Sequence, residues 1–227
     1  MCGAGERAVS WALYICGSLR LTYRCSTGAS HIHVISHLWR YKSWEEATEE
    51  LEVENKPDME MTPGNLSARY AHVDQSYEGA KRRLYVDLGI EEAKKREKNR
   101  WAILNIWRPI GPVNRDPLAV CDSRSIRDDE LVDTMHLVPA LWPRKPLENH
   151  MFAVNPPTEG PEQHKWYFLS GMDSNDALVF KMFDSKKSDG NARRVVHSAF
   201  ETPGDFGPPR KSVETRCFVF WEDQPAE

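Results

Sequence analysis

Four segments with the composition of β-strands follow one another in the C-terminal part of the chain, and they constrain the fold more than any other feature. They read KWYFLSG, DALVFKMFD, ARRVVHSAF and KSVETRCFVFW, and they are separated by MDSN, SKKSDGN and ETPGDFGPP. Aromatic and β-branched residues favour strands, whereas Gly, Asp, Asn and Pro favour the turns between them. Such a succession is typical of a β-sandwich or jelly roll.

The preceding part of the chain adds two strands and several helices to this prediction. HIHVISHLWRY alternates like a strand, and WAILNIWRPI is typical of a buried strand that ends at Pro109. A capped helix is expected at Ser43, a longer helix over residues 78–99, and a short helix within 122–138 that begins at Asp122 or Ser125. Residues 141–163 are expected to form a loop around one short strand. The predicted fold class is therefore mainly β with flanking helices.

The length of 227 residues fits one well-buried core, so a single main domain over residues 31–227 is expected. Residues 1–30 show neither helical nor strand periodicity. We therefore interpret them either as an atypical, irregular N-terminal extension or as the remnant of a different N-terminal region.

Composition excludes several classes of partner. Lys and Arg total 30 against 34 Asp and Glu, so no basic surface for nucleic acid is expected. The apolar run AVSWALYIC is too short to span a bilayer. Five scattered cysteines without a CxxC pair fit a reducing compartment, which predicts a cytoplasmic protein. Nothing in the sequence indicates the oligomeric state.

The segment AHVDQS places His72 and Asp74 two residues apart. In a strand, residues at this spacing point to the same face, so both side chains could bind one metal ion while Val73 packs behind them. An HxD pair also arises by chance in a chain of this composition, and a surface pair at the end of a strand is the alternative interpretation.

Two further elements downstream support the metal interpretation. His197 ends the predicted strand RVVHSAF, and Arg210 and Ser212 follow, again two residues apart. Two imidazoles and one carboxylate give iron(II) three ligands and leave positions open for substrate and oxygen. An arginine and a hydroxyl are suited to the far carboxylate of a second ligand. This order resembles the pattern of iron(II)- and 2-oxoglutarate-dependent oxygenases, whose fold is the double-stranded β-helix, a jelly roll.

Longer motifs carry a more specific resemblance. They are HVDQSYEGAKRRL, NIWRPIGPVNRDPLAVCDSRSI, HKWYFLSGMDSNDALVFKMFDS, VVHSAF and RKSVETR. Together they resemble the fungal hydroxylase/desaturase family typified by AsaB, which is related to gibberellin desaturase and to CmcJ. The resemblance covers about residues 31–222, whereas the first 25 residues do not resemble the corresponding part of the family.

The resemblance implies an oxidoreductase that uses iron(II), 2-oxoglutarate and O2 to hydroxylate or desaturate a small secondary metabolite. It assigns the metal ligands to His72, Asp74 and His197, and the co-substrate anchor to Arg210 and Ser212. It also implies that Asn105 and Trp107 line the pocket. Strand alternation puts Arg216 on the same face as Arg210, so Arg216 is either a rival anchor or a partner for Glu214.

Several alternatives stay open at this point. His164 could replace His197 as a ligand, although a hydrogen-bonded loop histidine is the simpler interpretation. His31, His33 and His37 could form a second metal site, but no carboxylate accompanies them. Cys121 and Cys217 are expected in the core. The chain could also be a non-catalytic jelly roll that binds a metabolite or partner, or a zinc hydrolase, which would leave Arg210 and Ser212 without a role.

Overall fold

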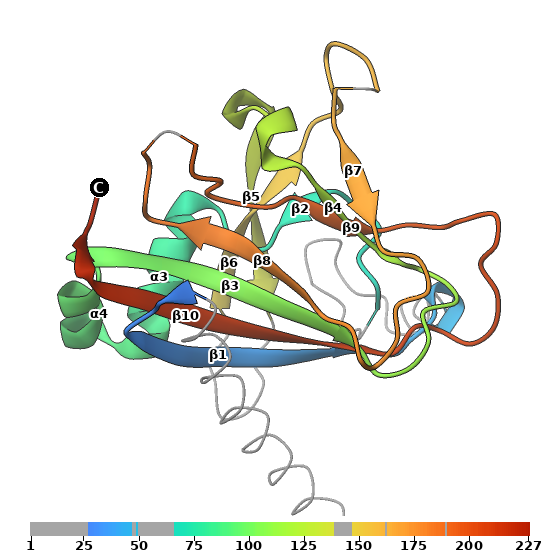
Figure 1. Ribbon diagram of the computed structural model, residues 1–227, viewed down its shortest axis with the longest axis horizontal. Helices are drawn as coiled ribbons and strands as arrows, with labels where there is room; N and C mark the ends of the chain where they lie inside the picture. The colour runs from blue at the N-terminus through green and yellow to red at the C-terminus, as the bar shows by residue number, and fades with distance from the viewer. Residues whose placement is uncertain (1–26, 47–48, 50–65, 139–146, 162, 189) are drawn as a thin grey trace, which may run out of the picture.

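The computed structural model describes residues 27–46, 49, 66–138, 147–161, 163–188 and 190–227, which form two antiparallel β-sheets with helices α3 and α4 at one end (Figure 1). The first sheet has the order β1-β10-β3-β8, namely β1 (His31–Arg40), β10 (Ser212–Pro225), β3 (Asn99–Pro109) and β8 (Leu178–Asp184). The second has the order β5-β6-β2-β9-β4-β7, namely β5 (Leu131–Val138), β6 (Leu147–Val154), β2 (His72–Val73), β9 (His197–Ala199), β4 (Leu118–Cys121) and β7 (Trp166–Phe168). This arrangement is a jelly roll, and the predicted fold class is confirmed.

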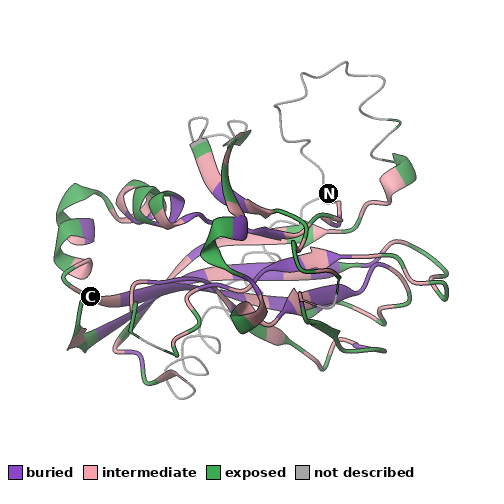
Figure 2. Ribbon diagram, turned by 90° about the horizontal axis from the view of Figure 1, so that it is seen from above, coloured by how far each residue is buried: buried purple, intermediate pink, exposed green. Residues whose placement is uncertain are grey.

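A core of aromatic and aliphatic side chains fills the space between the sheets, where buried residues are concentrated (Figure 2). Trp101, Phe218 and Phe220 of the four-stranded sheet belong to the same cluster as Val73 and Phe152 of the six-stranded sheet. Each of these side chains stabilises the fold by about 1.5–3 kcal/mol on burial. Because Val73 is fully buried, the short strand β2 is held in a fixed position.

Most strand predictions agree with the structure, and the helix predictions agree in part. The predicted helix over 78–99 is two helices, α3 (Tyr77–Leu88) and α4 (Ile90–Arg96). The break is at Gly89, whose φ of 77° is a left-handed conformation that favours glycine. The predicted helix start at Ser43 is confirmed by a reciprocal pair of hydrogen bonds between the backbone and side chains of Ser43 and Glu46. Part of that segment lies outside the described residues.

The short helix predicted within 122–138 is wrong. The segment contains two 3-10 turns, η1 (Ser123–Ser125) and η2 (Asp128–Glu130), followed by strand β5. Asp122 does cap the first turn, since its carboxylate accepts from the backbone N–H of Arg124 at 3.0 Å. The turn does not extend because β5 pairs with β6 over eight residue positions. The predicted strand ARRVVHSAF is also shorter than expected, since only His197–Ala199 is a strand.

Other predictions are only partly covered by the described residues. Strand β1 begins at His31, but residues 1–26 of the predicted extension lie outside them. Within the part of the chain that the structure describes, no helix is long and apolar enough to cross a bilayer.

Helix α3 touches strand β6 so closely that Gly79 has no room for a side chain. A Cβ at this position would lie 2.1 Å from the carbonyl oxygen of His150. We expect Gly79→Ala to lower the free energy of unfolding by about 1–3 kcal/mol, the usual cost of overpacking, as measured by urea denaturation. Gly111→Ala is the control, because a Cβ there has no neighbour within 4 Å. Equal stability of the two variants would contradict the close packing.

Candidate active site

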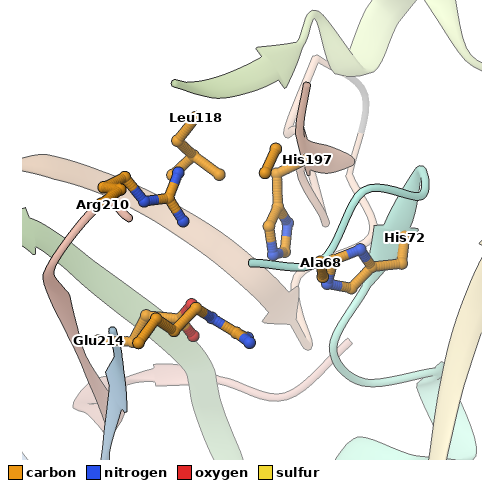
Figure 3. A pocket seen from close by; sticks show the side chains of 8 residues that line it. Ala68, His72, Leu118, His197, Arg210 and Glu214 are labelled. Carbon is orange, nitrogen blue, oxygen red and sulfur yellow. The ribbon is translucent and has the colours of Figure 1, made fainter. Parts of the chain in front are cut away.

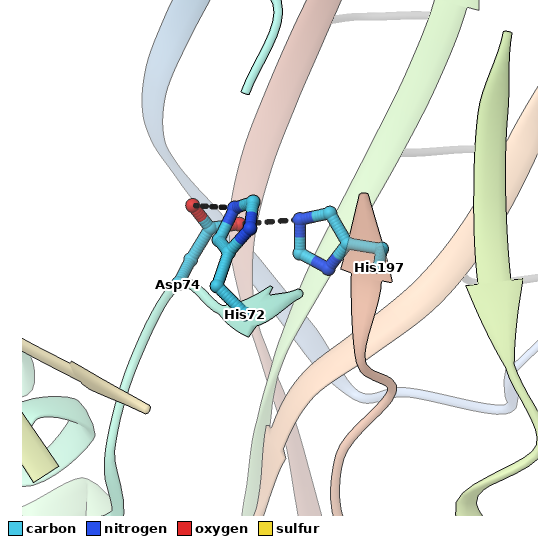
Figure 4. A group of neighbouring side chains, drawn as sticks. All are labelled: His72, Asp74 and His197. Atoms are coloured by element: carbon cyan, nitrogen blue, oxygen red, sulfur yellow. Dashed lines mark ion pairs between the residues drawn. The ribbon is translucent and has the colours of Figure 1, made fainter. Parts of the chain in front are cut away.

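Three potential metal ligands come together on the six-stranded sheet. His72 lies on β2 directly opposite His197 on β9, and Asp74 follows the end of β2. Each residue offers one ligand atom, and these atoms all lie within 4.8 Å of one another (Figure 4). All three residues are buried, with 3–5% of their surface exposed. The predicted spacing of His72 and Asp74 on one face therefore agrees with the structure.

Backbone carbonyl groups orient both imidazoles. Nδ1 of His72 lies 2.8 Å from the carbonyl oxygen of Tyr70, and Nδ1 of His197 lies 3.3 Å from that of Val195. Because a carbonyl only accepts, each Nδ1 carries the proton, and each Nε2 keeps a free lone pair. The Nε2 atom of His197 is 3.4 Å from Oδ2 of Asp74, and that of His72 is 4.0 Å from Oδ1. Imidazoles held in this way are typical of metal ligands.

The protonation states also suit a metal ion. Burial, followed by the neighbouring His197, lowers the pKa of His72 to about 4, so its imidazole is neutral at pH 7. Burial opposes ionisation of Asp74, but the Arg216 guanidinium and the two histidines lower its pKa below the usual range. Two imidazoles and one carboxylate form a donor set for a divalent transition metal.

A small cavity that is partly open to solvent adjoins the two histidines. Figure 3 shows Arg210 and Glu214 on one side of it and His72 and His197 on the other. The remaining lining residues are Arg40, Ala68, Leu118 and Ala199. The cavity thus joins the metal-ligand cluster to a buried cation.

Arg210 is a buried cation that forms no ion pair with a carboxylate among the described residues, although Glu214 lines the same cavity. Its Nη1 donates to the carbonyl oxygen of Asp116, its guanidinium lies 5.0 Å from the centre of the Trp107 ring, and its Nε has no hydrogen-bond partner there. Burial, and then the positive charge of Arg40, lower the pKa of Arg210 to about 10, which still leaves it charged at pH 7. A buried, incompletely paired guanidinium is suited to bind an anion.

The other predicted pocket residues lie near Arg210 but do not line the cavity. Trp107 packs under the guanidinium, and Nδ2 of Asn105 lies 3.4 Å from Oε2 of Glu214. Oγ of Ser212, Oδ1 of Asn105 and Nε1 of Trp107 have no hydrogen-bond partner among the described residues. Buried polar atoms usually form hydrogen bonds in folded proteins, so these three atoms are available to a bound polar group or to water.

Arg216, the rival anchor, has a different environment from Arg210. Its Nη2 donates to Oδ1 of Asp74 at 2.7 Å and to Oε2 of Glu214 at 3.2 Å. Burial opposes ionisation of Glu214, but Arg40 and Arg216 lower its pKa to about 2. Arg216 is therefore occupied by two carboxylates and does not line the cavity.

Sequence reasoning missed Arg40 and Tyr70. Arg40 is the last residue of β1 and pairs with Ser212 of β10. The same residue lines the cavity. Tyr70 is half-exposed, and its ring centre is 4.5 Å from that of His72. Tyr70 precedes His72 by two residues, so strand alternation could have placed it beside the ligand. Arg40 carries no comparable local signal.

The alternative ligands lie elsewhere. Nε2 of His164 is 3.2 Å from Oε2 of the buried Glu130, which makes it a hydrogen-bonded loop histidine. His31 and His33 pack near aromatic rings, and His37 bonds the hydroxyl of Thr215, so the described residues hold no metal cluster there. Cys121 and Cys217 are buried in the core, as expected.

Comparison with known proteins decides the family. A family described as "Oxidoreductase/YMDC permease-like domain" matches residues 14–220. Hydroxylase/desaturase CTB9 of Cercospora beticola is 60% identical over 88% of this chain and 61% of its own length. Hydroxylase/desaturase efuI of Hormonema carpetanum is 39% identical over 89% of this chain and 68% of its own length. The chain belongs to this fungal hydroxylase/desaturase family. The resemblance seen in the sequence motifs is thereby confirmed.

A solved structure supports the assignment of the fold. The iron and alpha-ketoglutarate-dependent endoperoxidase NvfI is 28% identical and superimposes with a TM-score of 0.70, covering 95% of this chain and 71% of that chain. The chain spans about three fifths of the length of the Cercospora relative.

Proposed function

We propose that this hydroxylase/desaturase family member is an oxygenase that depends on iron(II) and 2-oxoglutarate. His72, Asp74 and His197 would hold the iron and leave its other positions open. The observation that carries the proposal is a cavity that has two residues of the ligand cluster, His72 and His197, on one side and the Arg210 cation on the other. A zinc hydrolase would use the cluster but not the cation.

The residues present fit 2-oxoglutarate, which carries a carboxylate at each end. One end, a 2-oxo acid, can chelate the metal. Arg210 would bind the carboxylate at the other end, and the hydroxyl of Ser212, the first residue of β10, would be a second donor. Arg216 fits this role less well, because Asp74 and Glu214 already occupy its guanidinium.

The chemistry would be supplied by the bound iron, 2-oxoglutarate and O2, which together remove hydrogen from a carbon of the substrate. The chain would orient the reactants and exclude water. Burial keeps His72 neutral at pH 7, and the Asp74 carboxylate stays ionised, so neither of these two ligands needs to release a proton there. We infer a small secondary metabolite as substrate, and either hydroxylation or desaturation as the outcome.

Anaerobic titration tests this function. Addition of iron(II) and then 2-oxoglutarate to the metal-free protein is expected to produce the charge-transfer absorption of the chelate at one equivalent of each. Admission of O2 should then convert 2-oxoglutarate to succinate. Absence of both signals would contradict the proposal and favour the non-catalytic binding protein as the alternative.

The remaining expectations stay predictions. They are a cytoplasmic location and the absence of nucleic-acid and membrane partners.

A further inference from the structure

We propose that Arg216 is a positioning residue that fixes the Asp74 carboxylate so that one oxygen, Oδ2, is presented to the metal. A chain of buried charges from Arg40 through Glu214 holds Arg216 in place. This inference rests on the proposed function, because it concerns the same metal site.

The contacts of Asp74 separate its two oxygens. Oδ1 accepts from Nη2 of Arg216 at 2.7 Å, whereas Oδ2 has no hydrogen-bond partner and faces Nε2 of His197 at 3.4 Å. Asp74 follows the end of a strand of only two residues, so the sheet does little to fix its side chain. Apart from the two imidazoles, Arg216 is the one ionic partner of this carboxylate among the described residues.

Arg216 is itself held by Glu214, which in turn pairs with Arg40. Its Nη2 lies 3.2 Å from Oε2 of Glu214, and Nε of Arg40 lies 2.9 Å from Oε1 of the same carboxylate. Asn105 on β3 adds a contact to Glu214 at 3.4 Å. The charges therefore alternate in sign along the row Asp74, Arg216, Glu214 and Arg40. This row of charges runs from the end of β2 through β10 to β1.

A stabilising role does not explain such a chain. Taking charges out of water costs about as much as their mutual attraction returns, so buried ion pairs contribute little to stability compared with apolar side chains. The side chains of Asp74 and Glu214 are 7% and 6% exposed, and that of Arg216 is 17% exposed. The chain does have a geometric effect, because it leaves a single carboxylate oxygen free beside the imidazoles.

Titration of cobalt(II) into the metal-free protein measures this effect without oxygen chemistry. We expect Arg216→Gln to weaken cobalt(II) binding by about 10- to 100-fold, the usual effect of losing a partner of a metal ligand, and to change the cobalt(II) absorption spectrum. Arg216→Lys keeps the charge and should recover most of the affinity. Glu214→Gln keeps the shape of the side chain but removes its charge. It should also weaken cobalt(II) binding, by a smaller factor.

The matched control is Arg100→Gln. Arg100 forms an ion pair with the buried Asp184 at 2.8 Å. It lies on β3 opposite Trp221 of β10, which is five residues from Arg216. The Arg100→Gln variant should lose a similar ion pair but bind cobalt(II) with wild-type affinity. If Arg216→Gln does not fold, Glu214→Gln and Arg216→Lys decide the matter.

Wild-type affinity and spectrum in both Arg216→Gln and Glu214→Gln would overturn the positioning role. The same would follow if Arg216→Gln left cobalt(II) binding intact and weakened only 2-oxoglutarate binding, because Arg216 would then be the co-substrate anchor. Failure of the wild-type protein to bind cobalt(II) would instead contradict the proposed function, so the two failures are distinguishable.

Discussion

Asp74→Ala is expected to abolish iron-dependent turnover of 2-oxoglutarate. The substitution removes the one carboxylate of the ligand cluster and leaves two imidazoles, which bind iron(II) more weakly than the full set. Loss of a residue that only hydrogen-bonds a metal ligand lowers metal affinity by about 10- to 100-fold, so loss of the ligand itself should lower it more. Succinate formation and iron(II) affinity measure the effect.

The control for this variant is Asp133→Ala. Asp133 lies on β5 and is paired with the partly exposed His150, away from the cavity. Its removal should leave both succinate formation and iron(II) affinity at wild-type values. Full turnover in Asp74→Ala would show that the ligand cluster is not the reaction centre.

Arg210→Gln is expected to produce the second largest effect, a loss of affinity for 2-oxoglutarate with iron(II) binding unchanged. Removing one partner of a buried charge pair costs about 2–5 kcal/mol. This corresponds to a rise of about 30- to 3,000-fold in the half-saturating concentration of 2-oxoglutarate. The charge-transfer absorption of the iron-loaded protein, followed during titration with 2-oxoglutarate, measures it.

Arg108→Gln is the matched control, because Arg108 lies on β3 but is exposed and donates only to the carbonyl oxygen of Ser174. It should leave the half-saturating concentration unchanged. An unchanged value in Arg210→Gln would mean that another residue binds the far carboxylate, and Arg216 would become the first candidate.

The ligand cluster could be predicted from the sequence because its signals are local. The HxD pair follows from strand alternation, and His197 and Arg210 lie in or beside segments with clear strand character. Strand alternation could not distinguish Arg210 from Arg216, because it predicts both on one face; in the structure β10 begins at Ser212, so Arg210 precedes the strand and only Arg216 lies on it. The structure separates them through Asp74, which follows strand β2 of the other sheet and forms an ion pair with Arg216 but none with Arg210.

The errors arose where distant pairing overrides local preference. Asp122 has the chemistry of a helix cap, but pairing of β5 with β6 prevents a helix in this segment. Arg40 enters the site because β1 pairs with β10, two strands that are far apart in the sequence. Such contacts depend on strand order, which a single sequence does not specify.

The most direct test of the central claim is a crystal structure of the protein with manganese(II) and 2-oxoglutarate, prepared without oxygen. The account predicts one metal ion bound by Nε2 of His72, Nε2 of His197 and one oxygen of Asp74, with the far carboxylate of 2-oxoglutarate on Arg210. A metal ion bound elsewhere, or a co-substrate carboxylate on Arg216, would contradict it.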